Sequence, residues 1–214
     1  MQEEDFTPPW QTPEPPRVIK EGLLTGKKAL AEAPEIKGVP TGIEGLDDLF
    51  FLAVVKGKKV EKRPLGGIPL YSVLNVTGVS DTGKSVMVEQ FGVFRASQGD
   101  RVIFVTVESP AHFTMASLRL RAAAMGLDIE AFDDRIILVD AASHVSLREN
   151  LPNLLATLAY AIRTYKARFT LVDSVTGLFE HREMMARGIL RRLYGFLKQW
   201  YQTALLVSQK RGLI

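Results

Sequence analysis

The sequence of 214 residues contains no cysteine, which excludes disulfide bonds, thiolate metal sites and cysteine catalysis. It also lacks an apolar run of about 18 residues, so we expect no transmembrane helix and no membrane partner. The acidic start at residues 1–5 has no apolar region behind it, so we predict no signal peptide and a cytoplasmic location. The sequence also lacks a large excess of either charge. Its net charge of +3 neither requires nor excludes binding to nucleic acid.

The sequence is organised around a glycine-rich loop at residues 78–85, Gly-Val-Ser-Asp-Thr-Gly-Lys-Ser. It fills every fixed position of G-x-x-x-x-G-K-[ST], the phosphate-binding loop. Residues 71–77 before it predict a buried strand, and residues 85–98 after it predict a helix that Gly99 closes. Loop N–H groups at a helix N-terminus form a cage for phosphate oxygens. We therefore predict that ATP is bound by Gly78, Val79, Ser80, Asp81, Thr82, Gly83, Lys84, Ser85 and Val86.

Two side chains of the loop have predicted chemical roles. Lys84 is expected to reach the β- and γ-phosphates, and the hydroxyl of Ser85 is expected to bind Mg²⁺. A chance match on a glycine turn is the alternative. The flanking strand and helix favour the functional interpretation, because both are parts that the motif requires.

Four more apolar segments predict strands at residues 101–107, 135–140, 168–174 and 203–208, with helical patterns between them. The helices are expected to begin at an N-cap on Ser109, at Asn150 and at about residue 183. Strands that alternate with helices indicate an α/β fold, a mostly parallel sheet with helices on both faces. Acidic residues stand at the carboxyl ends of two of these strands, Glu108 directly after the first and Asp173 near the end of the third. Carboxyl ends of parallel strands are where ligands bind in such sheets. Surface carboxylates at strand ends are the alternative.

Three segments together resemble a known family: V-P-T-G-I-E-G-L-D-D-L from Val39, G-G-I-P from Gly66, and the phosphate loop. They resemble the KaiC-like branch of the RecA-type ATPases, over residues 39–209. The resemblance implies a RecA-like P-loop core with the five strands in the order third, second, fourth, fifth, first. It also implies Mg²⁺-dependent ATP hydrolysis at a subunit interface, which drives conformational change or regulation, in a homo-oligomeric ring such as a hexamer.

The resemblance also assigns roles to strand-end residues. F-V-T-V-E-S-P looks like the strand that ends in a catalytic glutamate pair, of which only Glu108 remains, since Ser109 fills the second position. Glu108 is then the general base. L-V-D-S-V-T-G-L-F looks like the second nucleotide motif, Walker B, in which Asp173 would help to hold Mg²⁺. Gln209 matches the polar residue that senses the γ-phosphate in RecA-like proteins. The predicted catalytic residues are Glu108, Lys84 and Gln209, and the predicted metal ligands are Ser85 and Asp173.

Departures from the family pattern keep other functions open. Asp81 stands where the family usually has glycine, and its charge opposes bound phosphate, so a regulatory module with little turnover is one alternative. Autophosphorylation is another. The family also continues beyond the strand at 203–208, with strands that cover the one at 71–77 and a basic residue for the next subunit's site. We therefore expect a truncated chain with slow turnover.

The predicted domains are a flexible, proline-rich tail with a weak helix at residues 1–37 and an ATPase core at residues 38–214. An insert at about residues 50–65 predicts a β-hairpin. Its basic residues at 56–63 could contact nucleic acid or an acidic protein, although a solvated hairpin is the simpler interpretation. A DNA-binding, recombinase-like ATPase is therefore a further alternative.

Overall fold

The computed structural model describes residues 17–178 and 186–209. The chain divides into two compact units, Met1–Glu35 and Ile36–Ile214. In the first unit, a 3-10 turn at Lys20–Gly22 precedes helix α1, which spans Gly26–Ala31 and is shorter than the weak helix expected there. The N-cap is Thr25, whose hydroxyl accepts a hydrogen bond from Lys28 N at 3.4 Å. Residues 1–16 of the predicted proline-rich tail lie outside the described residues.

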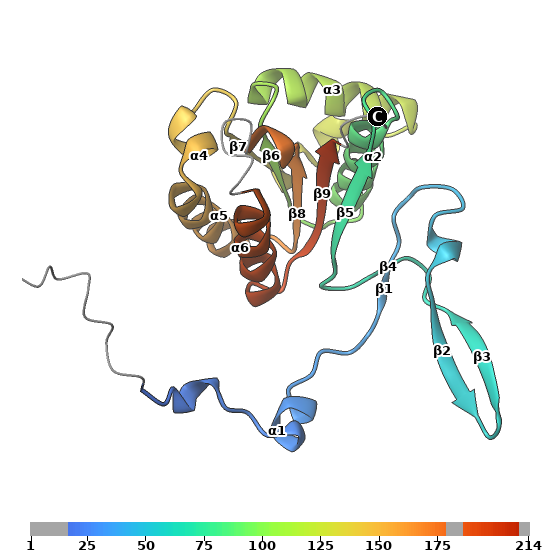
Figure 1. The fold of residues 1–214 in the computed structure, drawn as a ribbon. Coiled ribbons are helices and arrows are strands. Elements are labelled where there is room, and N and C mark those ends of the chain that lie inside the picture. Colours follow the sequence, from blue (N-terminus) through green and yellow to red (C-terminus); the bar gives the residue numbers. More distant parts are fainter. Residues whose placement is uncertain (1–16, 179–185, 210–214) are drawn as a thin grey trace, which may run out of the picture. The chain divides into compact units, whose positions relative to one another are not determined.

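The second unit is built on a five-stranded parallel sheet with the order β5-β9-β8-β6-β7 (Figure 1). Read from β7, this is the predicted order of third, second, fourth, fifth and first strand, so the RecA-like fold is confirmed. The strands are β5 (Val73–Gly78), β6 (Val102–Thr106), β7 (Ile136–Asp140), β8 (Phe169–Asp173) and β9 (Thr203–Gln209).

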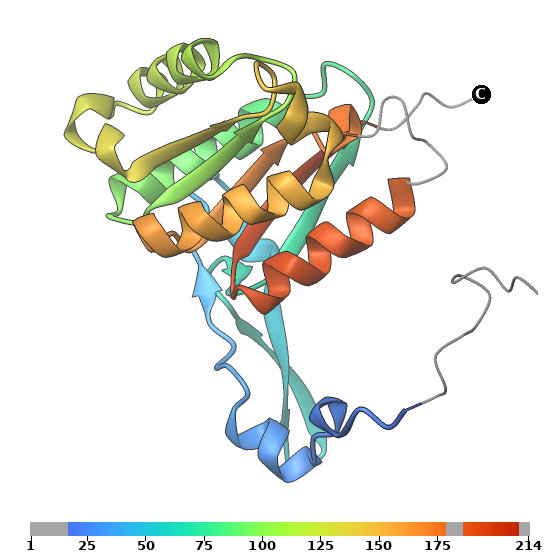
Figure 2. The same cartoon turned by 90° about the vertical axis from the view of Figure 1, so that its left-hand side faces the viewer.

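Helices cover both faces of this sheet (Figure 2). One face carries α2 (Lys84–Ser97) and α3 (Ala111–Ala124), and the other carries α5 (Leu151–Tyr165) and α6 (Ala186–Gln199). Strand side chains alternate between two apolar clusters, as the period of two in a strand requires. In β6, Val102 and Phe104 pack on the α2 side, whereas Ile103 and Val105 pack on the α5 side. Burial on both faces explains why β6 is apolar along most of its length.

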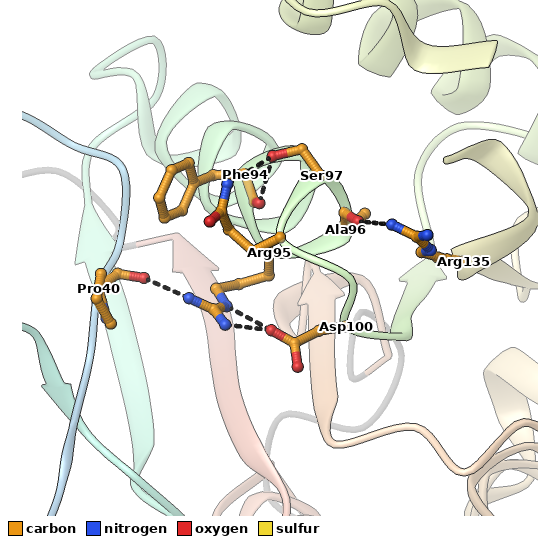
Figure 3. Close-up of polar contacts among 8 residues, drawn as sticks. Pro40, Phe94, Arg95, Ala96, Ser97, Asp100 and Arg135 are labelled. Carbon is orange, nitrogen blue, oxygen red and sulfur yellow. Dashed lines mark hydrogen bonds and ion pairs between the residues drawn. The ribbon is translucent and has the colours of Figure 1, made fainter. Parts of the chain in front are cut away.

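Helix α2 is held closely against the sheet. A Cβ atom at Gly92 would lie 2.2 Å from the Phe104 ring and 2.6 Å from Leu171 Cδ1, so only glycine permits this approach. At the end of the helix, Arg95 bonds with Asp100 and donates from Nη1 to Pro40 O at 3.3 Å (Figure 3). These contacts fix α2, and with it the phosphate loop, relative to the sheet and the segment that precedes the insert.

The insert forms an antiparallel hairpin of β2 (Phe51–Lys56) and β3 (Lys59–Pro64), with Val55 opposite Val60. A 3-10 turn at Asp47–Leu49 precedes it. The segments on either side of this region pair with each other, because β1 (Gly38–Val39) forms a short ladder with β4 (Ile68–Pro69). The hairpin therefore extends from a closed base, and its second strand is exposed throughout.

Several predicted element ends were wrong. The expected N-cap of α3 was Ser109, but α3 begins at Ala111, whose N–H donates to Asp140 Oδ2 at 3.0 Å. The cap comes from another strand, which local pattern cannot reveal. Asn150 caps α5 as expected, but the residues before it form a separate short helix, α4 (Val145–Glu149). None of the 3-10 turns in the described residues was predicted; besides the two given above, they span Ile129–Ala131, Asp133–Arg135 and Thr176–Leu178.

Two expectations concern the rest of the chain. The predicted start of α6 at residue 183 lies outside the described residues. Within the described ranges, no helix is both long enough and apolar enough to cross a membrane.

Candidate functional site

Strand register brings the predicted site residues to one edge of the sheet. Gly78, which begins the phosphate loop, lies opposite Gln209 in the β5–β9 ladder. Thr106, at the end of β6, lies opposite Asp173 on one side and Asp140 on the other. The loop and the four polar strand ends are thus side by side at the carboxyl edge, where open parallel sheets bind ligands.

The phosphate loop at residues 79–83 connects β5 with α2 and is exposed along its length. Its backbone turns through left-handed conformations at Asp81, with φ of 59°, and at Gly83, with φ of 83°. A left-handed aspartate is uncommon but is better tolerated than most side chains. Inside the loop, Thr82 Oγ1 donates to Val79 O at 2.9 Å, and Lys84 Nζ donates to the same oxygen at 2.5 Å. The ammonium group of Lys84 therefore lies within the loop.

Gln209 contacts the loop directly from the end of β9. Its Nε2 donates a hydrogen bond to Ser80 Oγ, and its backbone N donates to Thr176 Oγ1 at 2.8 Å. Thr176 begins the 3-10 turn that follows β8. The residue expected to sense the γ-phosphate thus joins the phosphate loop to that turn.

Asp173, at the end of β8, is close to three other predicted residues. Burial raises the pKa of the Asp173 carboxyl above its ordinary value, and the charge of Glu108 raises it further. The hydrogen bond from Ser85 and the charge of Lys84 lower that pKa, but they do not outweigh burial. The structure therefore brings together Ser85, Lys84, Glu108 and Asp173.

Glu108 is held in this group by the chain after β8. Ser174 Oγ donates a hydrogen bond to Glu108 Oε1 at 2.5 Å, and the same Oγ accepts one from Gly177 N at 3.3 Å. Sequence reasoning did not single out Ser174. The only local signal is its place directly after Asp173, and the partner in this bond is 66 residues away.

A cleft of about 280 Å³ lies beside Ser85, Glu108 and Asp173, between α2, α3 and the end of β6. Its wall includes Thr106, which is buried and whose hydroxyl has no partner in the described part of the chain. A cavity with polar walls and an unpaired buried hydroxyl is suited to water. The remaining lining residues are Val88, Glu89, Phe104, Val105, Ser109, Phe113, Thr114 and Ser117.

The residues present fit the magnesium ion that the motifs imply. Mg²⁺ prefers oxygen ligands and is usually held by one or two carboxylates together with substrate phosphates and water. Ser85 and Asp173 offer one hydroxyl and one carboxylate, and they lie within hydrogen-bonding range of each other. Among the described residues, no group of three or more histidine, cysteine or acidic side chains could form an all-protein metal site. The donor set is therefore that of a metal carried with a phosphate substrate.

The residues also fit ATP. The loop ends at the N-terminus of α2, where backbone N–H groups and the helix dipole favour an anion. Lys84 adds a positive charge inside the loop. Val86, the last residue of the predicted set, lies in the first turn of α2 and is 42% exposed.

Comparison with known proteins gives consistent matches. The model of the family described as "ATPase: KaiC" matches residues 39–212. A circadian clock oscillator protein KaiC from Parathermosynechococcus lividus is 32% identical over 195 residues, which cover 84% of this chain and 32% of that protein. The UPF0273 protein PF1931 of Pyrococcus furiosus is 27% identical over 188 residues, covering 81% of this chain and 69% of that protein.

The fold has a solved counterpart as well. The crystal structure of the KaiC-like protein PH0186 from Pyrococcus horikoshii matches with a TM-score of 0.64 at 26% identity, covering 82% of this chain and 73% of that one. The chain spans about a third of the length of the KaiC proteins that it matches, since it covers 32% of one and 34% of another.

Proposed function

The chain belongs to the KaiC family of ATPases, and from that premise we propose that residues 38–214 form a Mg²⁺-dependent core that binds and hydrolyses ATP. The observation that carries the proposal is the grouping of Ser85, Asp173 and Glu108 beside the phosphate loop. A chance loop motif would not bring a hydroxyl and two carboxylates from three separate elements to the same place.

The proposed reaction is in-line attack of water on the γ-phosphorus. The water oxygen forms a bond to phosphorus, the bond to the leaving ADP oxygen breaks, and Glu108 takes a proton from the water. Lys84 stabilises negative charge on the phosphates, and Gln209 lies against the loop at Ser80, where it can respond to the γ-phosphate. Mg²⁺, when bound by Ser85 and Asp173, supplies charge neutralisation at the β- and γ-phosphate oxygens.

The proposed site lies at an interface between copies of the chain, in a homo-oligomeric ring. The support is the exposure of residues 79–83, which leaves the outer side of a bound nucleotide open to a second copy. A nucleotide shared between subunits couples its hydrolysis to their relative movement, so the output is conformational change or regulation.

A second candidate is a regulatory module that binds nucleotide with little turnover. It is favoured by Asp81, a negative charge in the left-handed turn of the phosphate loop, and by Ser109, a hydroxyl directly after Glu108. Like charge near bound phosphates opposes binding by about 1 kcal/mol at an intermediate effective dielectric. This candidate differs from the first only in the rate of hydrolysis.

The hairpin of β2 and β3 supplies a proposed surface for an acidic partner. It carries five basic residues at 56–63 and one acidic residue, Glu61, which pairs with Lys56 at 2.8 Å. Lys62 Nζ lies 4.4 Å from the centre of the Phe51 ring. Nucleic acid and acidic protein both fit this charge, and a DNA-dependent ATPase is the form of the proposal that single-stranded DNA can test.

One experiment separates these functions. ATP turnover and native mass are measured on the purified chain, with and without Mg²⁺ and with and without single-stranded DNA. We expect turnover that requires Mg²⁺ and a mass that is a multiple of 23.7 kDa. Nucleotide binding without turnover indicates the regulatory module, and stimulation by DNA indicates the recombinase-like ATPase. Absence of ATP binding would contradict the proposal.

A further inference from the structure

One hydroxyl group controls the position of the proposed general base. Ser174 is 4% exposed, and its Oγ lies 2.5 Å from Glu108 Oε1. A serine hydroxyl has one proton to donate. Because this oxygen already accepts a hydrogen bond from Gly177 N, its own proton is directed at Glu108.

The backbone on both sides of this contact is anchored. Val107 N donates to Asp173 O at 3.0 Å, which ties the residue before Glu108 to the residue before Ser174. Val175 N donates to Val207 O at 2.8 Å, which ties the residue after Ser174 to β9. The serine is therefore fixed in place by two neighbouring strands.

The turn that supports Ser174 also lies against Glu108. A Cβ atom at Gly177 would lie 2.8 Å from Val107 Cγ1 and 3.7 Å from Glu108 Cγ. The first of these distances is too short for a carbon contact, so glycine is needed for the turn to approach this closely. The same turn directs the Gly177 N–H at Ser174 Oγ.

We propose that Ser174 is a positioning residue for Glu108, an inference that rests on the proposed ATPase function. The bond to Ser174 holds Oε1, and among residues 17–178 and 186–209 no hydrogen bond forms to Oε2. Oε2 is then the oxygen that takes the proton from the attacking water. A base that is already held in the reactive orientation loses less conformational entropy on reaching the transition state, which lowers the activation barrier.

The test is a double-mutant cycle on steady-state ATP hydrolysis, because a cycle isolates what one residue does through another. Ser174→Ala is expected to lower kcat about 10-fold with KM for ATP unchanged, a modest share of what general-base catalysis contributes. In a Glu108→Gln background, the same substitution is expected to cause no further loss. A serine that only stabilised the fold would lower kcat by the same factor in both backgrounds.

A matched control removes a hydroxyl from β8, the strand that directly precedes Ser174. Thr170 is fully buried in β8, and its Oγ1 donates to Gln202 Oε1 at 2.9 Å, on the face of the sheet away from the site. Thr170→Val is expected to lower Tm with kcat retained, whereas Ser174→Ala lowers kcat. Ser174→Thr, which keeps the hydroxyl, is expected to recover part of the activity.

The outcomes are distinct. A wild-type chain that hydrolyses ATP, together with equal losses in the two backgrounds or no loss at all in Ser174→Ala, overturns the inference and leaves the proposed function standing. A loss of kcat in Thr170→Val as large as that in Ser174→Ala also overturns it. A folded wild-type chain without turnover contradicts the proposed ATPase, and the positioning role fails with it.

Discussion

The backbone N–H of Val107, one residue after the last β6 residue paired with β8, donates a hydrogen bond to the carbonyl oxygen of Asp173 at 3.0 Å. This contact keeps the two chain segments together as they leave the sheet. Glu108 and Asp173 are close neighbours as a result, and the charge of Glu108 adds to the effect of burial in raising the pKa of Asp173. The relative positions of the proposed base and the proposed metal ligand therefore depend on this backbone hydrogen bond.

The role of Lys84 predicts a loss of nucleotide binding. Lys84→Ala removes the positive charge inside the loop and should weaken Mg·ATP binding about 100-fold, the scale of a lost hydrogen bond between charged groups. Calorimetric titration measures the change. The control is Lys198→Ala, since Lys198 Nζ donates to Tyr71 O before the start of β5, far from the loop. Equal affinities of wild type and Lys84→Ala would rule out the assigned role.

The position of Asp81 in the phosphate loop predicts that its replacement improves ATP affinity. Asp81→Gly removes a negative charge from the loop and places glycine at a φ of 59°, so both ATP affinity and stability should rise. Removal of like-charge repulsion is expected to tighten binding about 5-fold, which corresponds to about 1 kcal/mol. Asp81→Asn separates the two effects, because asparagine is neutral yet tolerates the left-handed conformation. Weaker binding by both variants would show that the carboxylate assists the site.

The raised pKa of Asp173 predicts a pH-dependent cost in stability. A folded-state pKa above the ordinary value of 3.8 contributes stability below that value, and this contribution is lost as pH rises through the raised pKa. Near neutral pH the buried, ionised carboxylate is therefore a net cost. Asp173→Asn should have a Tm a few degrees above wild type at about pH 7, and the difference should shrink toward about pH 4.

The effect of Mg·ATP on Tm can be compared in the same two proteins, wild type and Asp173→Asn. If Asp173 holds Mg²⁺ together with nucleotide, Mg·ATP should raise the Tm of wild type and should raise that of Asp173→Asn much less. A wild type that is more stable than Asp173→Asn at neutral pH without ligand would mean that the carboxylate has a stabilising partner.

Two helical glycines predict opposite effects on stability. Gly92→Ala places a methyl group 2.2 Å from the Phe104 ring and should destabilise the fold by about 2 kcal/mol through overpacking. Gly195→Ala, on the exposed side of α6, meets no atom within 4 Å and should stabilise by about 0.5 kcal/mol or more. Urea denaturation measures both. Similar midpoints for the two variants would contradict the close packing of α2.

The sequence was sufficient to predict the sheet, because its signals are local. The buried strands β6, β8 and β9 are largely apolar runs, and a motif marks the turn from β5 into α2. Strand β5, which was expected to be buried, lies at the edge of the sheet and has no fully buried residue. The strand order came from the family resemblance, and the register then explains why Gly78 and Gln209 meet. The site residues predicted from motifs lie together, although their catalytic roles remain predictions.

The features that were missed depend on contacts between distant segments. Asp140 caps α3 across the sheet, and the hydroxyl of Ser174 reaches Glu108 over 66 residues. A single sequence holds no local signal for either contact. The short α4 was missed for another reason, since five residues are too few for a helical period to be recognised.

The most direct test of the central claim is ATP turnover by wild type and Glu108→Gln, with Mg·ATP affinity measured on the same preparations. The substitution replaces the carboxylate by an amide of similar shape, which cannot take a proton from water. The account predicts that wild type hydrolyses ATP, and that Glu108→Gln binds Mg·ATP with similar affinity but loses turnover by about 100-fold or more. Turnover that is unchanged in Glu108→Gln would contradict it.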